Sequence, residues 1–450
     1  MHNPVDPAQE PVAATGRDPD GASATARRRR TRRASTRVPM PREIWILVAA
    51  AFLIAVGYGL IAPILPQFVV TFDVSVTAAA AVVSVFSFSR LITAPAAGTI
   101  GDRIGSRKVY LAGLIIVAVT TGLVAVAQAY WHILALRALA GFGSSMFSIS
   151  AMGLIVKLAP PGARGRASAL YGTAFLLGNV IGPLAGAAMS FLGMRWPFVI
   201  YGTGVLLAAL VVWWLMPNKK IDRLEGKDEG PAEGQDEGAA GDKPDTSPLT
   251  LAEAWRSSAF RALLVSNFAH GWINMGVRVA TIPLFAAAVF DQGVAMAGFA
   301  MAAYAAGNAV ILQFSGRMAD RIGRRPLILA GLVGSGVLAG FMGFADQPWS
   351  LLLFSILAGA AAGLLNPAQQ AVLADVIGNE RSGGRVLSTY QMFMDAGQIL
   401  GPIMVGLLVD GFGYRLGFAI CGLVAAVAAG AWIFGKETLH LTHAGAQTAR

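Results

Sequence analysis

Charged residues are scarce in this sequence, since Asp, Glu, Lys and Arg make up only 13% of its 450 residues. A soluble globular domain usually carries about 25%. Hydrophobic residues reach 55%, and the mean hydropathy is +0.59. A fold in water could not bury so much apolar surface. The shortage of charge therefore excludes an ordinary soluble protein and indicates that the chain lies in a lipid bilayer.

Cysteine is almost absent, because Cys421 is the single one in the chain. One cysteine forms no intrachain disulfide, and no Cys/His cluster has the spacing of metal ligands. The chain also lacks the Gly-x-x-x-x-Gly-Lys-Ser/Thr loop that holds nucleotide phosphates, and it has no selectivity-filter motif of a channel. The sequence therefore predicts no cofactor, no metal and no ATP hydrolysis, and it does not indicate an enzyme.

Apolar segments long enough to cross a bilayer, at about 20 residues each, recur twelve times. They form two groups of six, within residues 44–216 and 259–435. The sequence thus predicts an all-α membrane protein with twelve transmembrane helices in two bundles. The expected helices are 44–70, 77–99, 107–128, 131–157, 165–190, 194–216, 259–290, 294–317, 325–346, 348–376, 384–410 and 413–435.

Three polar segments flank these bundles. Residues 1–43 carry the basic run Arg27–Arg30 but no cleavable signal pattern, so we expect a disordered tail against anionic lipid; a nucleic-acid-binding arm is the less favoured alternative. Residues 217–258 hold nine acidic residues before Thr250 and are predicted to be a disordered linker. Residues 436–450 form a short second tail.

Basic residues are concentrated in one set of the predicted loops. The opposite set carries almost none, so the positive-inside rule places both termini and the linker in the cytoplasm. This predicts a multi-pass protein of the inner (cytoplasmic) membrane. The basic loop residues are Arg103, Arg107, Lys108, Lys157, Arg164, Arg166, Arg321, Arg324, Arg325, Arg381 and Arg385.

The two halves of the sequence match each other at a nearly constant offset. Chance similarity between apolar segments does not reproduce matched charges and Gly-Pro pairs, so the bundles are expected to be related by a pseudo-twofold axis. Matched positions, 218 or 219 residues apart, are Gly98 and Gly316, Asp102 and Asp320, Trp131 and Trp349, Arg166 and Arg385, and Gly182-Pro183 and Gly401-Pro402.

The repeat includes two copies of one loop pattern. They read Gly98-Thr-Ile-Gly-Asp102-Arg103-Ile-Gly105-Ser106 and Gly316-Arg-Met-Ala-Asp320-Arg321-Ile-Gly323-Arg324-Arg325. Here the chain resembles the major facilitator superfamily, and more closely its twelve-helix drug:proton antiporters. The resemblance implies a cytoplasmic gate, in which Asp102 faces the start of the eleventh helix and Asp320 the start of the fifth. A purely topogenic loop is the alternative.

Two further motifs carry the resemblance. In the fourth helix, Arg137 begins a run that ends at Gly143 and is similar to the family's membrane-embedded arginine motif. The fifth helix is similar to its antiporter motif, although close helix packing alone also explains such small residues. The first helix lacks the acid of many polyspecific cation exporters. The antiporter-motif residues are Gly178, Gly182, Pro183 and Gly186.

Ionisable residues inside a bilayer are costly and are usually functional. Five lie away from the helix ends: Arg90, Arg137, His270, Arg278 and Asp395. We expect Asp395, the single acid near mid-span, to couple protons or substrate, with Arg278 or Arg137 as its partner; a static buried salt bridge is the alternative. Three arginines against one aspartate favour neutral or anionic amphiphiles over permanent cations.

The predicted seventh helix carries a polar stripe, in which Asn267, His270, Asn274 and Arg278 follow at spacings of three and four. We expect this stripe to face a central cavity, although structural hydrogen bonding between helices is also possible. The remaining predicted lining residues are Asn308, Tyr58, Phe86, Tyr304 and Phe393.

Together these features predict a secondary active transporter that works by alternating access. A proton-coupled exporter of small amphiphilic molecules is favoured. A proton-coupled uptake carrier for a metabolite such as an organic acid or sugar is the alternative, and a membrane sensor or scaffold on a transporter fold is less favoured. The expected partners are a small-molecule substrate, protons and membrane lipid, without nucleic acid, and the monomer is expected to be functional.

Overall fold

The structure, a computed structural model, describes residues 40–160, 163–216, 249–378 and 383–439. The chain divides into two units, Met1–Met40 and Pro41–Arg450, and all helices below belong to the second. Most of the predicted tails and of the predicted linker lies outside the described residues, including every acid between Asp222 and Asp245.

The N-terminal half follows the predicted spans closely. Its helices are α2 (Arg42–Ile61), α3 (Leu65–Val70), α4 (Val76–Ile104), α5 (Ser106–Val124), α6 (Tyr130–Leu158), α7 (Arg164–Ala188), η1 (Ser190–Leu192) and α8 (Trp196–Leu215). The predicted continuous helix 44–70 is wrong in one respect, because it is divided between Ile61 and Leu65. Pro63 and Pro66 lack the backbone N–H that would continue the helical ladder.

The C-terminal half repeats this plan. Its elements are α10 (Leu251–Arg256), α11 (Ser258–His270), η2 (Gly271–Val277), α12 (Arg278–Val289), α13 (Gly293–Ile322), α14 (Arg324–Met342), α15 (Pro348–Ile377), α16 (Gly384–Phe412) and α17 (Tyr414–Phe434). α10 was not predicted and occupies the end of the predicted linker 217–258. A capping box between Thr250 and Glu253 begins it. Across the described residues, twelve helices are long and apolar enough to cross a membrane, which confirms the predicted fold class.

The seventh span is continuous from Ser258 to Val289, but its middle is not α-helical. η2 is a π-helix of seven residues between α11 and α12. A π-helix closes i→i+5 hydrogen bonds and is frequently found at functional sites. The side chains before and after η2 therefore do not keep the angular spacing that a regular α-helix would give them.

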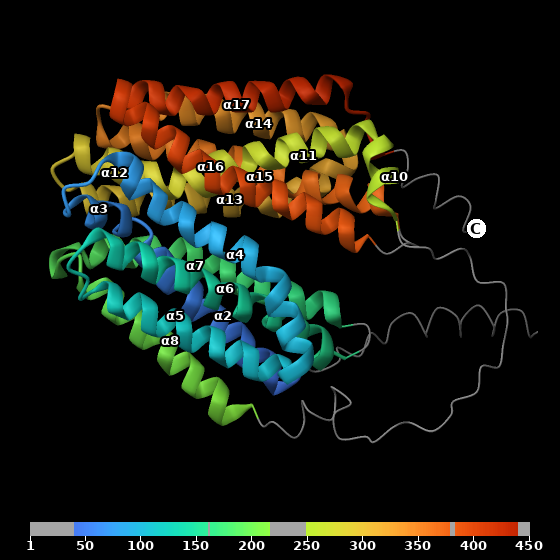
Figure 1. Cartoon of the computed structure of the whole chain (residues 1–450). Coiled ribbons are helices and arrows are strands. Elements are labelled where there is room, and N and C mark those ends of the chain that lie inside the picture. The colour runs from blue at the N-terminus through green and yellow to red at the C-terminus, as the bar shows by residue number, and fades with distance from the viewer. Residues whose placement is uncertain (1–39, 161–162, 217–248, 379–382, 440–450) are drawn as a thin grey trace, which may run out of the picture. The chain divides into compact units, whose positions relative to one another are not determined.

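Each half is packed around the same contact (Figure 1). In the N-terminal half α2 lies against α7, and in the C-terminal half η2 and α11 lie against α16. A Cβ on Gly59 would lie 2.8 Å from Pro183 Cδ, and one on Gly276 would lie 2.8 Å from Pro402 Cδ. The small residues let the backbones approach this closely. The halves themselves meet along α4 with α16 and α7 with α13.

Two glycines of the predicted gate loops have backbone angles that favour glycine. Gly105, between α4 and α5, has φ 102°, and Gly323, between α13 and α14, has φ 108°. A side chain would strain both positions. The loop pattern thus needs these glycines for its tight turns, whatever else the loops do.

Candidate functional site

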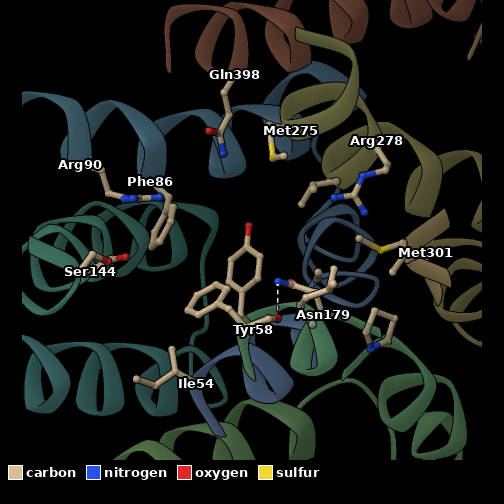
Figure 2. A pocket seen from close by; sticks show the side chains of 18 of the residues that line it. Ile54, Tyr58, Phe86, Arg90, Ser144, Asn179, Met275, Arg278, Met301 and Gln398 are labelled. Atoms are coloured by element: carbon tan, nitrogen blue, oxygen red, sulfur yellow. Dashed lines mark hydrogen bonds between the residues drawn. The ribbon is translucent and has the colours of Figure 1, made fainter. Parts of the chain in front are cut away.

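A central cavity of about 410 Å³ lies between the two halves (Figure 2). Helices α2, α4, α6 and α7 line one side, and α12, α13 and α16 line the other. Figure 2 shows Arg90 and Arg278 on opposite walls, with Tyr58 between them. The cavity is therefore shared by both halves, which is where a substrate site must lie if the halves move against each other.

All five ionisable residues singled out from the sequence line this cavity: Arg90, Arg137, His270, Arg278 and Asp395. The Arg137 side chain is only 4% exposed, and its guanidinium carbon lies 4.3 Å from the centre of the Phe86 ring. The guanidinium carbon of Arg278 lies 4.3 Å from the centre of the Tyr304 ring. Each ring faces a cation with its negative π-surface, which stabilises a partly desolvated charge.

Asp395 is held by its own helix. Gln391 Nε2 donates a hydrogen bond to Asp395 Oδ1 at 3.1 Å, and Arg90 lines the same cavity. Arg278 and Arg137, the two partners expected from the sequence, form no ion pair with Asp395 among the described residues. α4 packs against α16, so tertiary packing brings Arg90 to the acid.

A chain of polar contacts surrounds the π-helix. Tyr304 Oη donates to Asn274 Oδ1 at 2.9 Å, and the Asn274 amide nitrogen lies 3.2 Å from His270 Nδ1. Arg278 Nε donates to the Asn274 carbonyl oxygen at 2.8 Å. These bonds fix the direction in which Arg278 and His270 enter the cavity. His270 Nε2 is buried and has no partner among the described residues.

Three of the predicted lining residues lie elsewhere. Asn267 Nδ2 donates to the Tyr390 carbonyl oxygen at 2.6 Å, so it joins α11 to α16. Asn274 lies behind the wall in the network above, and Phe393 packs against a core cluster of the C-terminal half. The predicted stripe assumed a regular α-helix through residues 271–277, and the π-helix breaks that register. The other predicted lining residues, Asn308, Tyr58, Phe86 and Tyr304, do line the cavity.

The cavity also contains polar side chains that sequence reasoning missed. Two of them are Gln391 and Gln398 on α16. Together with the predicted Asp395 they follow at spacings of four and three, so this polar stripe could have been found in the sequence. Asn179, on α7, donates to the Phe175 carbonyl oxygen at 3.0 Å and lines the opposite wall. It lies inside the antiporter motif, directly after Gly178.

The antiporter-motif residues Gly178, Gly182 and Gly186 pack along α2. A Cβ on Gly182 would lie 2.4 Å from the Val56 carbonyl oxygen, and one on Gly186 would lie 2.6 Å from that of Leu60. The neighbouring Pro183 also lines the cavity. The motif therefore joins α7 to α2 directly beside the cavity.

One end of the molecule is held closed between the halves. Asp410, at the end of α16, accepts hydrogen bonds from the backbone nitrogens of Val76 and Thr77, both at 2.9 Å. Nearby, Gln67 Nε2 donates to the Gly293 carbonyl oxygen at 3.3 Å. The Asp410 carboxylate thus caps the first turn of α4 in the other half, where a negative charge is favoured.

The predicted gate residues occupy the opposite end. Asp320 is exposed and makes no hydrogen bond or ion pair with the described residues; the side chain of Arg164, at the start of α7, lies outside them, so the predicted contact between these helix ends stays a prediction. Arg103, Arg321 and Gly316 are also exposed. Gly98 and Asp102 fall outside the part of α4 whose side chains are described.

Arg324 turns into its own half, where it forms an ion pair with Asp375. The matching pair in the N-terminal half is Ser106 and Lys157, whose Nζ donates to Ser106 Oγ at 3.1 Å. The replacement of a basic residue by Ser106 is thus matched by a lysine in place of the acid.

Glu437 accepts hydrogen bonds from four backbone N–H groups, two of them at the start of α14. Burial by itself raises the pKa of Glu437, but these bonds outweigh it and hold the pKa below its usual value.

Two six-helix halves, a charged cavity between them and a closed end define the class of a membrane transport protein. A comparison with family models matches residues 47–291 and 263–449 to the Major Facilitator Superfamily. Both halves are covered, so the chain belongs to this family.

Relatives and solved structures agree with this assignment. The chain is 28% identical over 398 residues to multidrug resistance protein MdtG of Serratia proteamaculans (strain 568), covering 85% of this chain and 91% of the relative. It is 29% identical to MdtG of Enterobacter lignolyticus (strain SCF1), with 85% and 89% covered.

The fold is similar to that of a bacterial homologue of the human lysosomal transporter Spinster in an inward-facing, unoccupied conformation, with TM-score 0.72, 16% identity, and 89% and 96% of the chains covered. It is also similar to a POT family transporter in complex with 5-aminolevulinic acid, with TM-score 0.68, 13% identity, and 86% and 95% covered. This chain is accordingly a secondary transporter and not an enzyme. Its substrate is a small molecule, and it is a multi-pass protein of the inner membrane, with twelve helices among the described residues that can cross the bilayer.

Proposed function

We propose that this transporter exports small amphiphilic molecules in exchange for protons by alternating access. Asp395 carries the proposal, because it is the one acid among the described cavity residues and it accepts a hydrogen bond from the Gln391 side chain. A carboxylate in this position can take a proton when the cavity faces one side and release it when the cavity faces the other. The multidrug resistance proteins to which the chain is similar support export as the direction.

The orientation follows from the same proposal. With both termini in the cytoplasm, as the basic loops favour, the Asp410 end faces outward. The hydrogen bonds of Asp410 and Gln67 would then seal the outer side, and the exposed Asp320 and Arg321 would lie at an open cytoplasmic side. Closing that side would bring Asp102 and Asp320 to the helix starts of the opposite halves. The monomer contains the whole cavity, so we propose that it is the working unit.

Everted membrane vesicles test this proposal directly. Respiration makes their lumen acidic, so a proton-driven exporter accumulates a fluorescent amphiphile inside them, and an uncoupler abolishes this. Asp395→Asn should reduce the accumulation to the level of vesicles without the protein, at unchanged protein amount. Asp291→Asn, the same change at an exposed position, serves as the matched control. Full accumulation in Asp395→Asn would refute the role of this acid.

The charge of the cavity favours a second candidate, the uptake of an organic anion together with protons. A proton on Asp395 adds to the excess of arginine charge, so proton and anion would strengthen each other's binding. That linkage is typical of cotransport. Right-side-out vesicles separate the two functions: an inward proton gradient drives accumulation by a cotransporter and expulsion by an exchanger.

A further inference from the structure

The lining of the cavity carries an excess of positive charge. Among the described residues that line it, three guanidinium groups, those of Arg90, Arg137 and Arg278, face a single carboxylate, that of Asp395. One carboxylate can balance at most one of these three positive charges. Two positive charges therefore have no acidic partner within the cavity.

Two of the arginines are held by rings and not by acids. Arg137 lies over Phe86 and Arg278 lies over Tyr304. An aromatic face attracts a cation but does not neutralise its charge. This leaves the hydrogen-bonding edges of the guanidinium groups available, and the buried Nε atoms of Arg90 and Arg137 have no partner among the described residues.

An unpaired charge away from water is costly, and buried charges in proteins are normally paired or hydrogen-bonded. Arg137 is 4% exposed, so water can solvate it only through the cavity itself. The occupant of the cavity is thus the one component that can supply the missing negative charge. Arg90 and Arg137 belong to one half and Arg278 to the other, so both walls of the cavity carry positive charge.

The remaining lining is apolar and adaptable. Phe147 and Phe175 come from the N-terminal half, and Met275, Met301 and Met394 from the C-terminal half. Methionine side chains are flexible and polarisable, so they accept apolar groups of different shapes. A volume of about 410 Å³ lies within the usual range for small-molecule sites. The lining thus suits one charged head and one aromatic or aliphatic body.

From these contacts we infer that the cavity binds amphiphilic organic anions, with the carboxylate, phosphate or sulfonate head at Arg278. The inference rests on the proposed transport function of this cavity but not on its direction. Arg278 is the residue that determines selectivity for the anion, since η2 and the Tyr304–Asn274 bond fix its position. Arg90 contributes to anion binding when Asp395 is protonated, because the neutral acid no longer competes with the anion for its charge.

Three dyes with one common body test the inference on the full-length protein in lipid nanodiscs. Dansylglycine is an anion, dansylglycinamide is neutral and N-dansylethylenediamine is a cation. Fluorescence anisotropy should show dansylglycine binding about tenfold more tightly than the amide, a difference of about 1.4 kcal/mol, and the cation binding most weakly. Equal binding of the anion and the amide, or preference for the cation, would overturn the inference.

Variants of Arg278 test whether this residue causes the preference for the anionic dye. Arg278→Gln should weaken dansylglycine binding about tenfold and leave the amide within about twofold, while Arg278→Lys keeps much of the preference because it keeps the charge. Arg195→Gln is the matched control: Arg195 also lies over a phenylalanine ring, that of Phe68, but outside the cavity. If Arg278→Gln and Arg278→Lys bind all three dyes like the wild type, Arg278 is not the anion-binding residue and the assignment fails.

A small counter-ion must be separated from an organic substrate. Binding is therefore measured in gluconate and in chloride at equal ionic strength. Unchanged dansylglycine binding supports an organic anion as the occupant, whereas chloride that removes binding as fully as Arg278→Gln would show an inorganic counter-ion and overturn the inference. Because binding needs no gradient, anion selectivity without gradient-driven transport would contradict the proposed function alone. Gradient-driven transport of the dansyl cation without anion binding would contradict the inference alone.

Discussion

The two halves of the molecule each place an arginine over an aromatic ring at the central cavity. The rings, Phe86 and Tyr304, occupy matching positions 218 residues apart in the internal repeat. The arginines do not match, since Arg137 comes from α6 and Arg278 from α12. The position that matches Arg137 is Ser355. The repeat thus supplies an equivalent aromatic platform twice, and each half brings its charge to it from a different helix.

The two halves resemble each other more closely in their backbone packing than in the charged residues of the cavity. Gly59 meets Pro183 in one half as Gly276 meets Pro402 in the other. Asp395, by contrast, matches Leu176, which lines the same cavity without a charge. We propose that symmetry serves the relative movement of two like bundles, whereas the departures from symmetry serve binding and coupling.

The largest effect on stability is expected at glycines where the two halves share the same close helix packing. A Cβ at Gly397 would lie 2.1 Å from the Phe268 carbonyl oxygen, and one at the matching Gly178 would lie 2.8 Å from the Val56 backbone nitrogen. Gly397→Ala and Gly178→Ala should each cost about 1–3 kcal/mol through overpacking and lower the thermal unfolding midpoint in nanodiscs by up to about 3 °C. Gly172→Ala, with nothing within 4 Å of its Cβ, is the control. A shift in one half alone would show that the packing is not equivalent.

An intermediate effect is expected where the halves differ at the closed end. Asp410 caps α4 across the interface, and the matching position in the N-terminal half is Phe191, which is 82% exposed. Each hydrogen bond to a charged acceptor contributes about 1.5–3 kcal/mol. Asp410→Asn should therefore favour opening of this end. A cysteine placed at cavity residue Asn308 should then react about tenfold faster with an impermeant maleimide added outside whole cells.

The cysteine at position 308 is also used to measure a control variant. Asp291→Asn lies near the same end but forms no described bond across the halves, so it should leave the reaction rate unchanged. An unaltered rate in Asp410→Asn would mean that the apolar contacts, and not the carboxylate, hold this end closed.

The smallest effect is expected at the other end of the C-terminal half. Because the pKa of Glu437 in the folded protein lies below its usual value, its stabilisation is complete above the usual pKa and is lost as the pH falls through the folded value. Glu437→Gln should lower the unfolding midpoint slightly at pH 7, by no more than about 2 °C. The difference from the wild type should disappear in acid. A difference that persists unchanged at low pH would assign it to packing instead of charge.

Much of the fold could be predicted because it depends on local and periodic features. Twelve apolar runs, the repeat and the basic loops are all visible in the chain, and the glycines at 105 and 323 do take the positive φ that their loops require. Some predictions were wrong because the backbone departs from a regular α-helix. Pro63 and Pro66 divide the first span, and Asn274 lies within the π-helix and outside the cavity. Asn267 instead bonds to the Tyr390 carbonyl oxygen of α16.

The sequence by itself determined that the chain spans a membrane twelve times in two related halves, and which ionisable residues it carries inside the bilayer. It determined this because hydrophobic length and the rarity of buried charge can be read one segment at a time. Only the tertiary structure decided that Arg90 and Asp395 line one cavity, where α4 packs against α16, and that Asp410 joins the halves. Pairings between distant helices depend on which faces meet, and helix faces are set by packing, not by spacing along the chain.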